Sequence, residues 1–132
     1  MASLYNAVGN AMLLVAGGNP ADLYLYSAAG QGWAETALFR IGSGTLEWID
    51  SMDDPFEHDK YLFDSIMALW EAEEPAKRWT VMEFEVRGTT FNTQLWYEGE
   101  LPPNELGFER RDELIRRRFG NLEVIYPPEP AY

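Results

Sequence analysis

One segment of alternating side chains restricts the fold more than any other feature of the sequence. In 79–86 (WTVMEFEV), Met82 and Phe84 alternate with Glu83 and Glu85. Successive side chains of a β-strand point to opposite faces, so the pattern predicts a strand with one buried face and one face in water. Such a strand needs partner strands, and the neighbouring segments supply them.

Two hairpins are predicted from the patterns on either side. After the turn at RGTT, segment 90–97 (TFNTQLWY) is expected to return with Phe91 and Leu95 facing inward. Earlier, DLYLYSA and WAETALFRI read as two strands joined by the turn GQG. We expect GSGTLEWID to add a short edge strand with Leu46 and Trp48, and LEVIY to form a last extended segment.

The first and last parts of the chain have helical periodicity. Ser3 is the expected N-cap of a first helix, which the Gly17-Gly18 pair ends. A last helix contains RRDELIRRR, and Gly120 occupies the position expected just after its C-terminus.

A central helix between the hairpins has the clearest start signal. Asp54 is its expected N-cap, Pro55 stands at the first helical position, and Glu57 follows three residues after the cap. The helix is expected to run to about Glu74, where Pro75 ends it. The residues predicted to be buried are Leu62, Phe63, Ile66, Met67, Leu69 and Trp70.

The order helix, hairpin, helix, hairpin, helix predicts an α+β fold. Its antiparallel sheet would be built from two hairpins and covered by three helices, mainly on one face. The 132 residues most simply form one domain, 1–132, with a proline-rich tail at about 127–132.

The net charge of the protein limits the kinds of molecule that it can bind. The formal net charge is -12, from 22 acidic residues against 10 lysines and arginines, which disfavours binding to a nucleic-acid backbone. A basic protein is the simplest partner. The sequence has no cysteine, no signal peptide pattern and no apolar run near the ~20 residues of a membrane helix. We therefore expect a cytoplasmic protein without membrane contact.

An acidic region extends from Glu47 to Glu74, with ten acidic residues against the single Lys60. It is either a solubilising surface or a docking surface that speeds association with a basic partner. Trp48 is a candidate aromatic anchor, because tryptophan is enriched in interface hot spots. The predicted partner-binding residues are Trp48, Asp53, Asp54, Glu57, Glu71 and Glu74.

The arginine-rich segment RRDELIRRR divides into two faces when it is read as a helix. Arg111 and Arg118 lie two turns apart and fall within the apolar face, where a buried guanidinium needs a carboxylate. Both are predicted to form structural ion pairs, with Glu83 and Glu85 as possible partners. Arg116 belongs to the solvated face.

An enzymatic alternative rests on the acids that precede the central helix. Asp53, Asp54, Glu57 and His58 could serve a small metal-dependent hydrolase. Acids at a helix N-terminus are also explained by capping and by the helix dipole. We expect no catalytic site, metal or cofactor, and a protein-interaction module with an unknown cytoplasmic partner is a further alternative.

Several motifs resemble the YezG-like immunity (antitoxin) family of bacterial polymorphic toxin systems. They are LYLYS, LFDSIMALWEAEEPAKRWTVMEFEVRG, FERRDELIRRRFG and YPPEP, and the resemblance extends over most of the chain from about Leu23. The loop YEGELPPNELG departs from the family pattern, in which this segment is more acidic. The resemblance implies a small cytoplasmic protein that binds and neutralises a toxin domain, typically a nuclease. The sequence leaves the oligomeric state open.

Overall fold

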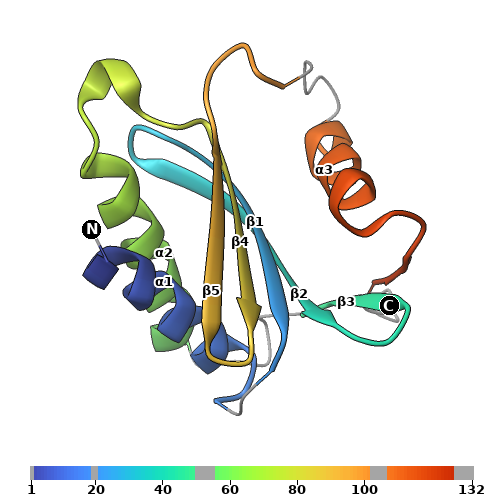
Figure 1. Ribbon diagram of the computed structural model, residues 1–132. Coiled ribbons are helices and arrows are strands. Elements are labelled where there is room, and N and C mark those ends of the chain that lie inside the picture. The colour runs from blue at the N-terminus through green and yellow to red at the C-terminus, as the bar shows by residue number, and fades with distance from the viewer. Residues whose placement is uncertain (1, 19–20, 50–55, 102–106, 127–132) are drawn as a thin grey trace, which may run out of the picture.

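A computed structural model describes residues 2–18, 21–49, 56–101 and 107–126 (Figure 1). Within these ranges the elements, in chain order, are α1 (Ala2–Val15), β1 (Leu23–Gly30), β2 (Trp33–Ile41), β3 (Thr45–Trp48), α2 (Phe56–Glu71), the 3-10 helix η2 (Pro75–Lys77), β4 (Val81–Arg87), β5 (Thr90–Trp96), α3 (Glu109–Phe119) and β6 (Glu123–Ile125). No helix in the described part is long and apolar enough to cross a membrane.

The strands form one six-stranded sheet in the order β5-β4-β1-β2-β3-β6. Neighbouring strands are antiparallel except β3 and β6, which are parallel. The β1–β2 and β4–β5 hairpins lie side by side because β1 pairs with β4. The predicted α+β fold, with two hairpins in one sheet and three helices, is confirmed, and β3 and β6 extend the sheet.

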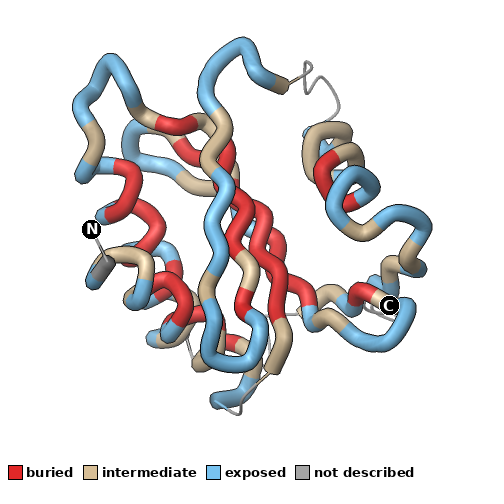
Figure 2. Tube along the Cα trace, viewed as in Figure 1, coloured by how far each residue is buried: buried red, intermediate tan, exposed pale blue. Residues whose placement is uncertain are grey.

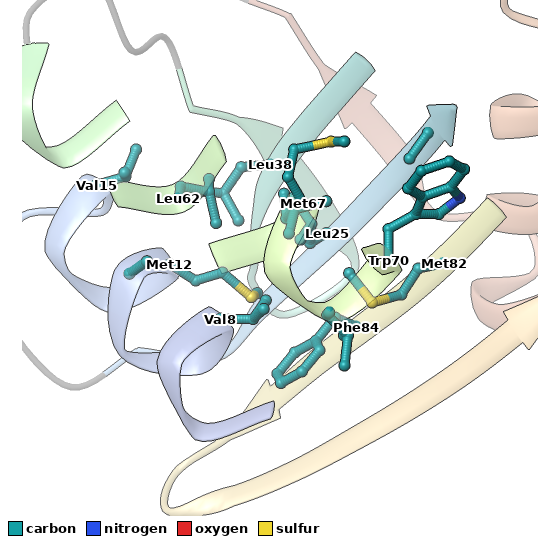
Figure 3. Close-up of a cluster of buried hydrophobic side chains, with 14 of the residues drawn as sticks. Val8, Met12, Val15, Leu25, Leu38, Leu62, Met67, Trp70, Met82 and Phe84 are labelled. Atoms are coloured by element: carbon teal, nitrogen blue, oxygen red, sulfur yellow. The ribbon is translucent and has the colours of Figure 1, made fainter. Parts of the chain in front are cut away.

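Helices α1 and α2 cover one face of the sheet (Figure 1). Their apolar side chains meet those of β1, β2 and β4 in the larger core cluster, which Figure 3 shows in close-up. Met12 from α1, Ile66 from α2 and Phe84 from β4 are completely buried there. Most of the hydrophobic stabilisation therefore comes from this face.

Helix α3 lies against the opposite face (Figure 1). Leu114 and Ile115 of α3 join Tyr24, Phe39 and other buried residues of the sheet in a second, smaller cluster. The prediction that segment 79–86 has one face in water is wrong for this reason. Both faces of β4 are buried, and even Glu83 is only 3% exposed.

Three local predictions also need correction. Ser3 lies inside α1 rather than before it, because the helix begins at Ala2. Helix α2 ends at Glu71, so Glu74 belongs to the turn that leads into η2. Phe63 is 38% exposed instead of buried. The start signal at Asp54 and Pro55 and the tail at 127–132 lie outside the described residues.

Gly9 of α1 gives a direct test of the packing between α1 and β5. A Cβ atom at Gly9 would lie 2.4 Å from Cε2 of Phe91. Glycine to alanine in a helix interior normally stabilises by about 1 kcal/mol. Here we expect Gly9→Ala to lower the free energy of unfolding by about 1–3 kcal/mol, as overpacking does, measured by urea denaturation. In a Phe91→Ala background the same substitution should stabilise. A stabilising effect in both backgrounds would contradict the packing.

Candidate functional site

A buried carboxylate lies at the centre of the α3 side of the sheet. Glu83 of β4 accepts hydrogen bonds from three elements. The Tyr24 hydroxyl donates to Oε2 over 2.7 Å and the Trp96 indole Nε1 donates to Oε1 over 2.9 Å. Arg118 Nε donates to Oε2 over 3.0 Å. Both oxygens are engaged, so the burial of this charge is compensated by one cation and two neutral donors.

Arg118 links α3 to two acids of the same strand. Besides Glu83, its Nη1 atom lies 3.3 Å from Oε2 of Glu85, and its side chain is only 26% exposed. The guanidinium also lies over the ring of Tyr24, 5.7 Å from the centroid, and Phe119 meets that ring edge-on. These contacts fix the C-terminal half of α3 against β1 and β4.

The same surroundings perturb the phenol of Tyr24. Burial raises the pKa of Tyr24 far above its usual value of 10.0, and the charge of Glu83 and the hydrogen bond to it raise the pKa further. Tyr24 is therefore protonated at neutral pH, and its hydroxyl donates a hydrogen bond to Glu83.

Arg111, the other arginine assigned to the apolar face, has different contacts. Its Nε atom lies 3.6 Å from Oδ1 of the adjacent Asp112, and its guanidinium lies over Trp48, 5.2 Å from the ring centroid. The ion pair that Arg111 makes with Asp112 thus lies within α3 and does not connect the helix to a strand. A cation–π contact attaches this end of the helix to β3.

The solvated arginines of α3 pair within their own helix. Arg116 and Arg117 both bind Glu113, at spacings of three and four residues. Both pairs follow the helical spacing that brings side chains three or four residues apart onto one side. These exposed pairs contribute little to stability.

The acidic surface of α2 lies on the other side of the molecule. Glu57, Asp64 and Glu71 are all exposed, and helical spacing places them along one line of α2 that faces away from the sheet. Lys60 lies beside this line, and its Nζ atom is 2.7 Å from Asp64. We call Glu57, Asp64 and Glu71 the acidic line of α2.

Two exposed aromatic residues accompany the acidic line. Tyr61 is 39% exposed, and it lies on the same outward side of α2 between Glu57 and Asp64. Phe63, on the adjacent part of the helix, is exposed to a similar degree. Neither residue was predicted from the sequence to be exposed at an interface. The spacing of Tyr61 from Glu57 could have identified it, but periodicity places Phe63 in the apolar face.

Trp48 is not beside the acidic line. Its ring packs edge-on against Phe39, 5.2 Å between centroids, and contacts Tyr126 and Arg111. It belongs with the smaller cluster on the α3 side of the sheet, whereas α2 covers the other side. Trp48 and the acids of α2 therefore lie on opposite sides of the sheet, too far apart to form the single interface that was predicted.

The remaining predicted residues have separate positions. Glu74 is exposed after α2, with its Oε2 3.9 Å from Nζ of Lys77. Asp53 and Asp54 lie outside the described residues. His58 is half-buried in the first turn of α2. Among the described residues, no group of three histidine, aspartate or glutamate side chains is close enough to hold a metal ion.

Open hollows adjoin α3, and two of them involve its arginines and the Glu83 site or β6. One, of about 230 Å³, is lined by Glu83, Gln94, Trp96, Leu114, Arg117 and Arg118. The other, of about 470 Å³, lies between the end of α3 and β6 and is lined in part by Arg116 and Tyr126. In the first hollow the carboxylate and both arginines already have partners, which leaves little free charge for a ligand.

Comparison with known proteins found no match, either among protein-family models or among the curated proteins. The resemblance to the YezG-like family therefore stays a prediction.

The ion pair between Arg118 and Glu83 can be tested by truncation. Arg118→Ala leaves a nearly buried carboxylate without its cation and should lower the free energy of unfolding by about 3–5 kcal/mol. Arg116→Ala removes an exposed cation from the same helix and should cost less than about 1 kcal/mol. Urea denaturation at neutral pH provides both values. Equal costs would contradict the burial of the pair.

The raised pKa of Tyr24 predicts a loss of stability in alkali. Above pH 10 the unfolded chain releases the Tyr24 proton while the folded chain retains it, so the unfolded state binds fewer protons. Stability is therefore full below pH 10 and declines as the pH rises further. In urea melts between pH 8 and 11, Tyr24→Phe should reduce the slope of this decline relative to wild type. An unchanged slope would mean that Tyr24 ionises equally in both states.

Proposed function

We propose that the protein is a non-enzymatic immunity-type protein that binds a basic partner, with a toxin domain as the partner class. The observation that carries the proposal is the acidic line of α2 with Tyr61 within it. It combines an excess of exposed negative charge with an exposed amphipathic ring on a regular, well-packed helix. Interfaces commonly combine these two features.

Helix α2 and the turn that follows it have an excess of negative charge. From Phe56 to Lys77 the chain has six acidic residues (Glu57, Asp59, Asp64, Glu71, Glu73 and Glu74) and two lysines. The lysines are each within 4 Å of one acid, Lys60 of Asp64 and Lys77 of Glu74. The field outside α2 therefore favours cationic partners and raises their encounter rate.

Helix α2 can serve as a docking surface because its inner side is firmly packed in the core. Ile66, Leu69 and Trp70 hold the inner side of α2 in the larger core cluster, and Trp70 Nε1 donates a hydrogen bond of 2.9 Å to the Trp79 carbonyl. The outer side is thus presented in a fixed orientation before a partner arrives. Binding to a preorganised surface loses less conformational entropy.

The proposal predicts opposite kinetic effects for charge and for the aromatic ring. Glu57→Lys with Glu71→Lys should slow association with the cognate partner by about tenfold or more at low salt, with a smaller change in dissociation. Tyr61→Ala should mainly speed dissociation. The partner to use is the product of the neighbouring gene, captured by pull-down, with growth rescue as the activity readout.

A matched control separates a local from a general charge effect. Glu35→Lys with Glu123→Lys changes the net charge equally, at exposed positions of β2 and β6 rather than of α2. The control pair should slow association much less. Equal slowing by both pairs, or no effect of salt on association, would refute docking through the acidic line.

A further inference from the structure

Strand β5 is an unprotected edge of the sheet. It pairs with β4 on one side, and no strand in the described part of the chain pairs with its other side (Figure 1). An edge of this kind presents backbone N–H and C=O groups to any further strand. In β5 the Leu95 carbonyl accepts a hydrogen bond from the Gln94 side chain, which a new strand would displace. Proteins usually protect such edges with charge, proline or short length. The seven residues of β5, TFNTQLW, include neither a charged side chain nor a proline.

The helix beside this edge is equally uncharged. Helix α1 (ASLYNAVGNAMLLV) has no acidic or basic side chain, although 24% of the whole sequence is charged. It approaches β5 closely at Gly9, which contacts Phe91. The exposed residues on α1 are small and polar, such as Asn6 and Asn10. We call α1 and β5 together the uncharged margin.

We propose that β5 pairs antiparallel with β5 of a second copy of this chain, around a twofold axis at Thr93. The five central residues of β5 are self-complementary in this register, whereas Thr90 at one end would lie opposite Trp96. Phe91 would lie opposite Leu95, Asn92 opposite Gln94, and Thr93 opposite itself. Each of these central pairs joins like with like, and directly opposed side chains of this kind stabilise neighbouring strands.

Alternation along the strand restricts the register. Phe91 and Leu95 pack against the larger core cluster on the α1 side, whereas Asn92 and Gln94 lie opposite Glu85 and Glu83 of β4. A slip of one residue would bring α1 of one copy to the side of the joint sheet that carries α3 of the other. The twofold register keeps both α1 helices on one side, where their uncharged residues face each other.

Charge favours a second copy over a basic protein at this margin. The uncharged margin has no acidic side chain to attract a cationic partner. Two molecules that each have a formal net charge of -12 repel one another at long range, and contact is least unfavourable where neither surface is charged. Salt should therefore strengthen self-association, whereas it should weaken docking through the acidic line.

Single cysteines test the twofold pairing and its register. The chain has no cysteine, so a variant contains one thiol only. Directly opposed Cβ atoms lie about 4.5–5.5 Å apart, near the range that a disulfide spans. Thr93→Cys should form a disulfide-linked dimer under mild oxidation. Thr90→Cys, on the same strand, would be about 20 Å from its copy and should stay monomeric. No dimer with Thr93→Cys, or equal yields from both variants, would overturn the proposal.

Sedimentation equilibrium of the unmodified protein is the second test. We expect a concentration-dependent dimer whose dissociation constant falls as salt is added. Thr93→Asp opposes two carboxylates at the axis and should raise that constant several-fold, whereas Thr36→Asp, an exposed change on β2, should not. Circular dichroism checks that both variants fold. A wild-type monomer at all concentrations, or dimerisation that salt weakens, would refute the pairing. Neither result would affect docking through the acidic line, which is measured by association kinetics with the basic partner.

Discussion

The buried carboxylate of Glu83 is the constraint on which the α3 side of the molecule depends. A charge in this position is stable only if donors reach it, and they come from three other elements: Tyr24 of β1, Trp96 of β5 and Arg118 of α3. Apolar contact through Leu114 alone would allow α3 to lie in several positions. The need to place a guanidinium at Glu83 selects one of them.

The sequence predicted the elements well where the pattern was local. Alternation identified β4 and β5, and glycine signals located the C-terminal ends of α1 and α3 to within a few residues. The sequence-based predictions failed for residues that are buried by an element far away in the chain. Alternation alone placed Glu83 in water because it cannot show that α3 covers β4, although the arginine pattern of α3 correctly named Glu83 and Glu85 as possible partners of Arg118. Trp48 was grouped with α2 because sequence proximity does not reveal the intervening sheet. Both sides of a sheet have to be known before a polar residue on it can be placed.

The surface is divided by charge along the sheet. Acids dominate the outward side of α2, arginines with their carboxylate partners occupy α3, and α1 with β5 is free of charge (Figure 2 shows the exposure of these elements). The arginines of α3 are mostly neutralised within the molecule, at Glu83, Glu85 and Glu113. The net negative charge is therefore found mainly outside α3, above all on α2. The two proposed contacts use an acidic region, α2, and an uncharged one, α1 with β5.

The parallel pairing of β3 with β6 affects the order in which the fold can be completed. Thr45 pairs with Glu123, so the chain between them includes α2, β4, β5 and α3. A ribosome releases β1, β2 and β3 long before β6 exists. During synthesis β3 is consequently an open strand with one neighbour, and closing this long loop is a late and entropically costly event. Chaperones that shield exposed strands would have their longest opportunity at β3.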